Sequence, residues 1–423
     1  MSLTHAAGAG AAVALAIGIW AAGPTTPGDG DPAGFVATSS RPQEPDAIEA
    51  AFPHESYAPG SVATLELTTP TEGVSLRVYR VGPEVVVTRG EKTMNGVPVG
   101  PERRLGSVRA GAKVPIEVGA WTSGLYFAKL TARGRVGFAP FVVRPGRLGE
   151  NRVAIVLPTR TWQAYNFRDD DGDGLADTWY AMRGKPVARL GRPFLNRGVP
   201  PHFAQYDLRF IRWLHATGRT VDMLSQEDLD EVDGATLAGA YELLVFPGHH
   251  EYTTTAEYDA VTQFRDRGGN LAFLSANNFF WRVDVRGRSM RRVAKWRDLG
   301  RPEAALLGVQ YVANDRGERK RPWLVRRSRT AHRLFAGIRL GNGREFSLGG
   351  IEIDGVAPSS PANVEVVAEI PHLFGRGRSA HMTHYETVRG AKVFSAGAFT
   401  LAGRVYELEV RQLLTNVWRE LTE

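Results

Sequence analysis

Cysteine is absent from this chain of 423 residues. Its absence excludes a disulfide framework, a cysteine-ligated zinc or iron–sulfur centre and a thiol nucleophile. The excess of positive over negative charge is also small. The chain has 52 Lys and Arg and 45 Asp and Glu, for a net charge of +7. A charge this mild indicates no particular partner.

Several common motifs are missing as well. The chain has no Walker A loop, no Gly-x-Ser-x-Gly nucleophile elbow and no Rossmann glycine fingerprint. One local excess of charge remains, since Arg286–Arg329 holds fourteen Lys or Arg against four Asp or Glu. Such a patch suits phosphates or an anionic cell surface. No nucleic-acid fold signature accompanies it, so we favour a solvated basic face and expect no nucleic-acid partner.

The first 48 residues have the composition of a leader and a tether. The run Ala6–Ala22 is uncharged, and twelve of its 17 residues are Ala or Gly. We interpret residues 1–23 as an export signal or membrane anchor, although a basic n-region is missing. The alternatives are a disordered Ala/Gly tail or a misassigned start. Residues 24–48 are rich in Pro, Gly and Asp and predict a flexible linker. We therefore expect an extracytoplasmic protein, secreted or held at the membrane by its N-terminal segment.

Two folded domains follow. Over residues 49–146, short alternating runs such as Val62–Leu67 and Gly124–Leu130 are separated by turn residues, which predicts an Ig-like β-sandwich. Over residues 147–423, apolar strands such as Val153–Leu157 and Leu243–Phe246 alternate with helical patterns such as Ala256–Arg267. That alternation predicts an open, mostly parallel α/β sheet. Functional side chains in such sheets gather at the carboxyl ends of the strands.

An acidic loop carries the strongest local motif. Asp169, Asp171 and Asp173 occupy alternate positions, Gly174 permits a sharp turn, and Asp177 follows three residues later. Alternate carboxylates can converge on a hard cation, so the loop predicts a structural calcium site. An EF-hand would place a glutamate where Tyr180 stands, and the alternative is a solvated acidic loop.

A second polar motif directly follows the predicted strand Leu243–Phe246. It contains His249, His250, Glu251 and Tyr252. Imidazole, carboxylate and phenol groups at the end of a strand predict a metal site or an acid–base cluster. The alternative is a hydrogen-bonded turn that caps the next helix.

Several motifs in one order resemble a known family. They are Thr159–Asn166 (TRTWQAYN), Tyr206-Asp207, Gly248–Tyr252 (GHHEY), Asn277–Arg282 (NNFFWR), Gly350–Asp354 (GIEID) and Val393–Gly397 (VFSAG). This series resembles the large (β) subunit of N,N-dimethylformamidase and its relatives. The similarity covers roughly residues 151–423, with Tyr57–Val143 similar to the preceding β-sandwich.

The resemblance implies a glutamine-amidotransferase-like α/β fold in the second domain. Without cysteine, the amidotransferase triad cannot operate. The resemblance implies instead a mononuclear iron held by two tyrosines and a glutamate. Tyr206 and Tyr252 are the best matches for the tyrosines, and either Glu251 or Glu303 would complete the site. Phenolate and carboxylate are hard ligands suited to ferric iron, which can polarise an amide carbonyl.

Two functions follow from these observations. The first is an exported, metal-dependent hydrolase of the C–N bond of a small amide, with His249 or His250 moving protons and Glu251 completing the site or acting as a base. The second is a non-catalytic protein that binds a ligand or surface and is stiffened by calcium. The substrate and the oligomeric state, which includes a homo-oligomer, stay open.

Overall fold

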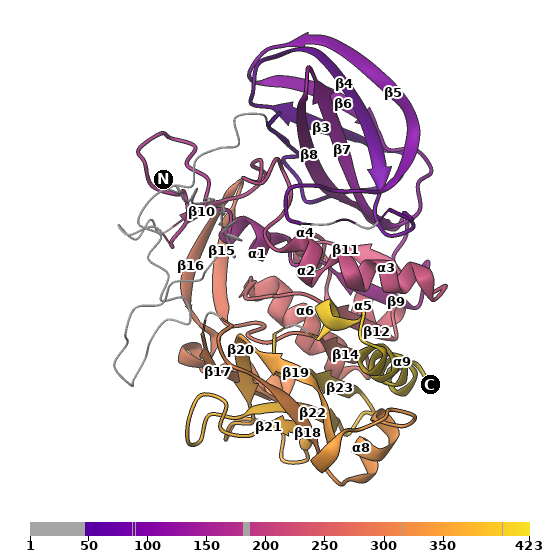
Figure 1. Cartoon of the computed structure of the whole chain (residues 1–423), viewed down its shortest axis with the longest axis vertical. Coiled ribbons are helices and arrows are strands. Elements are labelled where there is room, and N and C mark those ends of the chain that lie inside the picture. Colours follow the sequence, from indigo (N-terminus) through magenta and orange to yellow (C-terminus); the bar gives the residue numbers. More distant parts are fainter. Residues whose placement is uncertain (1–46, 87, 89, 181–186, 316, 400) are drawn as a thin grey trace, which may run out of the picture.

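The computed structural model describes residues 47–423, apart from 87, 89, 181–186, 316 and 400. The predicted leader, 1–23, and residues 24–46 of the predicted linker lie outside the described residues. Within the described ranges, no helix is long and apolar enough to cross a bilayer. The described chain mixes helices with several sheets and is rich in strand (Figure 1). This confirms the prediction of a mixed α/β protein.

Two sheets made of residues before Pro145 pack together at one end of the molecule (Figure 1). One has the order β1 (Ala50–Ala51), β3 (Val62–Leu67) and β6 (Ala112–Glu117). The other has the order β2 (Ser56–Tyr57), β8 (Arg135–Val143), β7 (Gly124–Ala132), β4 (Thr71–Arg80) and β5 (Val97–Val108). The alternating pattern explains the packing, since Ala63, Leu65 and Leu67 are buried while Val62 is exposed.

A nine-stranded sheet organises the rest of the chain. Its first five strands run parallel, in the order β11 (Asp222–Leu224), β9 (Val153–Val156), β12 (Leu243–Phe246), β14 (Asn270–Phe273) and β23 (Lys392–Ser395). Every residue of β9 and β12 is buried, as expected for strands covered on both faces. The last four strands are antiparallel, in the order β22 (Ala380–Glu386), β21 (Glu365–Ile370), β18 (Lys320–Val325) and β19 (Glu345–Gly350).

Helices cover both faces of the parallel part. On one face, α3 (Leu208–Ala216) and α9 (Leu408–Thr422) pack against Ile155, Val245 and Ala272. On the other face, α5 (Gly234–Ala240) and α6 (Thr255–Asp266) pack against their neighbours in the same strands, such as Val156 and Phe246. Successive strand residues point to opposite faces, which explains this division. The shorter helices are α1 (Thr159–Ala164), α2 (Phe203–Tyr206), α4 (Gln226–Asp230), α7 (Ala304–Leu307) and α8 (Arg329–Leu334), with 3-10 turns at Trp296–Leu299, Asn342–Arg344 and Ala402–Arg404.

Two small sheets stand beside the large one. The first has the order β10 (Val187–Arg189), β16 (Ser289–Lys295), β15 (Trp281–Arg286) and β13 (Tyr252–Thr253). The second pairs β17 (Gln310–Asn314) with β20 (Glu352–Gly355). Both sheets carry residues of the candidate site. Neither sheet was predicted from the alternation of strands and helices.

Candidate metal centre and active site

The site forms where the parallel strands end. After β12, residues 247–251 turn over the sheet edge, and β13 then pairs in parallel with β15, with Tyr252 opposite Trp281. The backbone of Glu251 is fixed on both sides, because its N–H donates to Thr161 Oγ1 at 3.2 Å and its carbonyl accepts from the N–H of Trp281 at 2.9 Å. Gly248 allows this loop to lie close to Asp207, since a Cβ there would approach Asp207 Oδ1 to 2.4 Å.

Glu251 is the centre of the cluster, with a fully buried side chain. Its Oε2 accepts from the Tyr165 hydroxyl at 2.7 Å, from the Tyr180 hydroxyl at 3.4 Å and from His249 Nε2 at 3.2 Å. Its Oε1 is buried and has no hydrogen-bond partner among the described residues. A buried carboxylate oxygen without a partner is costly, so this atom indicates a site for a cation or another ligand.

Three phenols surround this carboxylate. Tyr165 follows α1, Tyr180 follows the acidic loop, and Tyr252 lies in β13. The Tyr165 and Tyr180 rings stack with centroids 4.9 Å apart, and the hydroxyls of Tyr180 and Tyr252 are hydrogen-bonded. Burial and the nearby Glu251 raise the pKa of Tyr165 and of Tyr252 well above the ordinary value for tyrosine. These two phenols therefore keep their protons unless a cation is present to stabilise the phenolate.

His249 lies between two acidic side chains. Burial opposes its charged form, but the carboxylates of Glu352 and Glu251 raise its pKa to about 9. Its Nδ1 contacts the carbonyl of Ala276 at 3.1 Å, and its Nε2 is 4.0 Å from Glu352 Oε2. His249 is therefore protonated at neutral pH and holds that proton between two carboxylates.

Glu352 reaches the cluster from β20 and is 3% exposed. Burial raises its pKa to about 7, against the opposing effect of His249. The Asn277 amide lies beside it, in a residue with φ of 54°, a left-handed conformation that asparagine tolerates better than most residues. The backbone N–H of Asn277 donates to Asp354 Oδ1 at 2.9 Å. Glu352 and His249 thus form an acid–base pair with pKa values of about 7 and about 9.

A small cavity of about 30 Å³ adjoins Tyr165 and His249. Its wall includes four large aromatic rings, those of Trp162, Tyr165, Tyr206 and Phe399. Asp207 is its acidic group; Asp207 Oδ2 accepts from Trp162 Nε1 at 3.1 Å, and burial raises its pKa to about 7. A space of this size accommodates about two water-sized groups. It suits a small, largely apolar fragment of a ligand.

The structure brings some of the predicted residues together and separates others. His249, Glu251 and Tyr252 share the cluster. His250 instead fastens the loop to the sheet, since its Nε2 contacts the carbonyl of Val156 at 2.9 Å and burial lowers its pKa to about 3. Tyr206 lies across the cavity, where its ring packs against Phe399 at 4.9 Å. Phe399 in turn contacts the His249 ring at 4.7 Å.

Glu303 lies in another environment. It precedes α7, is 1% exposed and forms an ion pair with the Arg297 guanidinium. Burial raises the pKa of Glu303, while Arg297 opposes the shift. The Arg297 guanidinium therefore compensates the charge of Glu303, whereas Glu251 contacts His249 through Oε2 and keeps Oε1 without a partner among the described residues.

Sequence reasoning missed Tyr165, Tyr180 and Glu352. Two of them stand inside motifs that carried the family resemblance, Thr159–Asn166 and Gly350–Asp354, and Tyr180 takes the twelfth position counted from Asp169. The signal was therefore present in the sequence. It could not be assigned to a shared site because the three residues come from widely separated elements.

The acidic loop gathers part of the predicted calcium set. Ligand atoms of Asp169, Asp171 and Asp177 all lie within 4.8 Å of one another. Asp173 is outside that group, and its Oδ1 accepts from the N–H of Leu175 at 2.8 Å. The loop thus presents three convergent carboxylates rather than four.

Parts of this chain are similar to known proteins. Over 116 residues, the chain is 35% identical to the N,N-dimethylformamidase beta subunit of Alcaligenes sp., a match that covers 27% of this chain and 15% of that protein. The corresponding subunit of Paracoccus aminophilus is 35% identical over 111 residues, or 24% of this chain and 14% of that protein. The matched segment thus spans about one seventh of the length of each relative.

Similarity to solved structures is slight. A superoxide reductase (neelaredoxin) from Ignicoccus hospitalis superposes on 23% of this chain and 77% of its own, with 15% identity and a TM-score of 0.16. A similarity this small defines neither fold nor function. The family comparison is much broader, because residues 108–406 match the family described as N,N-dimethylformamidase beta subunit-like, C-terminal. The chain therefore belongs to the N,N-dimethylformamidase beta subunit-like family.

Proposed function

We propose that this protein is an exported, metal-dependent hydrolase that cleaves the C–N bond of a small amide. The observation that supports this most is the convergence of two phenols, Tyr165 and Tyr180, on Oε2 of Glu251, whose other oxygen is buried without a partner. Hard oxygen donors of this kind suit ferric iron. Of the two glutamates left open by the sequence, Glu251 is then the carboxylate ligand, and Tyr165 and Tyr180, rather than Tyr206 and Tyr252, are the phenolate ligands.

The remaining groups fit acid–base work on an amide. Iron bound to Tyr165, Tyr180 and Glu251 would supply a Lewis acid that polarises the carbonyl. Glu352 accepts a proton from the attacking water, and protonated His249 delivers a proton to the departing nitrogen. Water oxygen joins the carbonyl carbon, the C–N bond breaks, and the products are a carboxylate and an amine. The aromatic cavity beside His249 holds the small substituent of the substrate.

Metal analysis and visible absorption of the purified protein test this proposal. We expect bound iron and a visible band from tyrosinate, and hydrolysis of members of a panel of small amides, measured as amine release. Tyr165→Phe should weaken and shift the band, because one of the two phenolate ligands is lost, whereas Tyr206→Phe, a matched change across the cavity, should keep it. Colourless protein without a transition metal contradicts the proposal.

A second candidate is a non-catalytic extracytoplasmic protein that binds a ligand or surface. The three convergent carboxylates of the acidic loop favour it, because they suit a structural calcium ion. Protein that carries calcium alone and hydrolyses no amide on the panel supports this candidate.

The proposal extends to the architecture. We propose that residues 49–146 are an Ig-like sandwich domain and residues 147–423 a glutamine-amidotransferase-like domain. Export or membrane anchoring would be directed by residues 1–23, through a linker over residues 24–48.

A further inference from the structure

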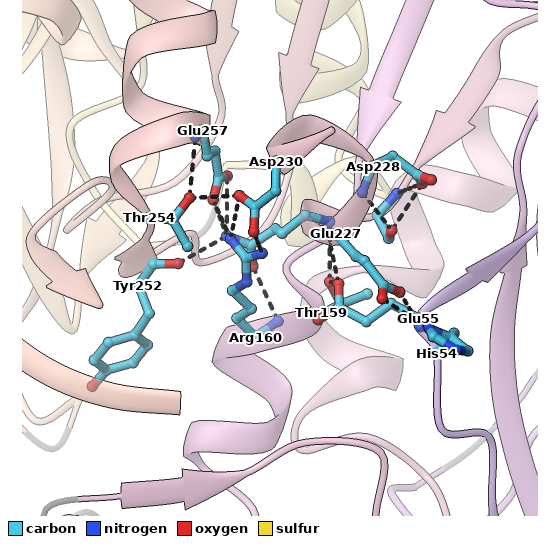
Figure 2. A network of polar contacts seen from close by, with 12 residues as sticks. His54, Glu55, Thr159, Arg160, Glu227, Asp228, Asp230, Tyr252, Thr254 and Glu257 are labelled. Carbon is cyan, nitrogen blue, oxygen red and sulfur yellow. Dashed lines mark hydrogen bonds and ion pairs between the residues drawn. The ribbon is translucent and has the colours of Figure 1, made fainter. Parts of the chain in front are cut away.

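A buried arginine, Arg160, lies near the site loop, residues 247–252. Arg160 is the second residue of α1 and is only 1% exposed. Its Nη1 donates to Glu257 Oε2 at 2.9 Å, and its guanidinium also pairs with Asp230 at the end of α4 (Figure 2). A buried charge is tolerated only when it is paired and hydrogen-bonded. These contacts therefore fix α1, α4 and α6 relative to one another.

Gln226 connects this ion pair to the site. Its side chain is fully buried, and its Oε1 accepts from the backbone N–H of Arg160 at 3.1 Å. Its Nε2 donates to Glu257 Oε1 at 3.0 Å and to the backbone carbonyl of Tyr252 at 2.9 Å. The Gln226 amide oxygen thus accepts from α1, and the amide nitrogen donates to α6 and to β13.

The carbonyl that Gln226 holds belongs to the site loop. The Tyr252 ring turns away from Arg160 (Figure 2), toward Trp179 and Tyr180. Glu251, the carboxylate at the centre of the cluster, is the preceding residue. A displacement of the Tyr252 carbonyl therefore moves a phenol of the cluster and the backbone that carries its carboxylate.

The other end of the network reaches the β-sandwich. Glu55 lies in the strand region near β2, and its Oε2 accepts from Thr159 Oγ1 at 2.5 Å and from the N–H of Glu227 at 3.0 Å (Figure 2). Thr159 Oγ1 in turn accepts from the N–H of Gln226 at 3.2 Å. Thr159 and Glu227 are the chain neighbours of Arg160 and Gln226. Glu55 of the β-sandwich is therefore hydrogen-bonded to the first turns of α1 and α4, next to Arg160 and Gln226.

We propose that Gln226 is a positioning residue, which sets the Glu251–Tyr252 backbone through the Tyr252 carbonyl, and that Glu55 of the β-sandwich supports it through Thr159. The consequence for catalysis rests on the proposed function, whereas the consequence for the loop does not. The β-sandwich is then a working part of the site, although none of the groups that converge on Glu251 comes from it.

Amide hydrogen exchange at residues 249–254 of the full chain tests the inference, followed by mass spectrometry. Gln226→Glu removes the donor to Tyr252 while keeping the shape, and exchange there should rise roughly fivefold to tenfold, the change expected from one lost hydrogen bond. Gln263→Glu, the same change at an exposed position of α6, should leave exchange at these residues unchanged.

A reciprocal double variant separates positioning from stability. Gln226→Glu combined with Glu257→Gln keeps one amide, one carboxylate and the charge beside Arg160, but the donor to the Tyr252 carbonyl is still missing. We expect the melting temperature to recover and the fast exchange at residues 249–254 to persist. Recovery of both together, or unchanged exchange in Gln226→Glu, would overturn the inference. If the single variant fails to fold, the double variant alone decides.

Two further measurements test the role of Glu55 and the consequence for catalysis. Thr159→Val should raise exchange at residues 249–254 by a smaller factor, and unchanged exchange would overturn the role of Glu55. In protein that binds iron and cleaves amides, Gln226→Glu should lower kcat more than it changes KM. If the native protein shows neither iron nor hydrolysis, the proposed function fails, and the exchange experiment still decides the positioning role.

Discussion

Two clusters of oxygen donors, one fully buried and one partly exposed, offer sites for cations in different ways. In the acidic loop, the Asp169 carboxylate accepts from the backbone N–H groups of Gly172 and Gly174, at 2.7 and 2.8 Å. In the buried cluster, Glu251 keeps one oxygen without a partner, and Tyr165 keeps its proton because burial raises its pKa. The loop carboxylates lie partly in solvent, whereas the buried Tyr165 phenol ionises only when a cation is bound nearby.

This difference separates the expected consequences of losing each ion. An ion in the acidic loop would stabilise the fold near the loop, by the free energy of its binding. An ion in the buried cluster would change the protonation of its ligands and so enable chemistry.

The largest effect is expected at the central carboxylate. Glu251→Gln keeps the shape but removes the negative charge, so iron content should fall and amide hydrolysis should drop at least about 100-fold. Iron analysis and amine release measure the two quantities. Glu303→Gln is the matched control, because Glu303 is equally buried but is paired with Arg297. An equal loss in both variants would argue against Glu251 as the ligand.

The rate should show a bell-shaped dependence on pH. It should rise as Glu352 loses its proton, near its pKa of about 7, and fall as His249 loses its proton, near its pKa of about 9. The two groups interact, so the limbs report the pair rather than either residue alone. Glu352→Gln should remove the rising limb and lower the rate about 100-fold or more. A rate that keeps the rising limb in this variant would exclude Glu352 as the base.

The acidic loop should respond in stability rather than in rate. With calcium at about 100 times its dissociation constant, a single site stabilises the fold by about 2.7 kcal/mol. A chelator should lower the melting temperature of the native protein, and Asp171→Ala should abolish that response. Asp173→Ala should keep most of it, because Asp173 lies outside the convergent group. Equal responses in both variants would contradict the three-carboxylate site.

The last prediction concerns a residue of the cavity wall. Burial raises the pKa of Asp207 from 3.8 to about 7, so the folded state binds this proton more tightly than the unfolded state. The resulting stability is fully present below pH 3.8 and is lost as pH rises to about 7. Asp207→Asn should make the fall in unfolding free energy over this range shallower, by up to about 1.4 kcal/mol per pH unit. Denaturant titrations at several pH values measure it, and an unchanged slope would refute the burial effect.

The sequence predicted the elements that depend on local pattern. The buried strand Leu243–Phe246 has the predicted bounds, and α6 differs from the predicted Ala256–Arg267 by one residue at each end. Residues 203–216 form two helices, α2 and α3, which are separated at Asp207. The antiparallel part of the nine-stranded sheet was not predicted, since its register is set by tertiary pairing.

The site was predictable to a similar degree. His249, Glu251 and Tyr252 follow one strand, so position along the chain was enough to group them. Tyr165 and Glu352 join them only through the fold, and no spacing along the chain expresses that proximity. Our proposal of Glu251 rather than Glu303 as the ligand likewise needed the structure, because it depends on the Arg297 partner of Glu303.

Anomalous scattering at the iron absorption edge, from a crystal of the native protein, tests the central claim most directly. We expect one peak within bonding distance of the Tyr165 and Tyr180 hydroxyl oxygens and of the Glu251 carboxylate, and no iron peak among Asp169, Asp171 and Asp177. A peak ligated by Tyr206 or Glu303 instead, or no peak in protein that hydrolyses amides, would contradict it.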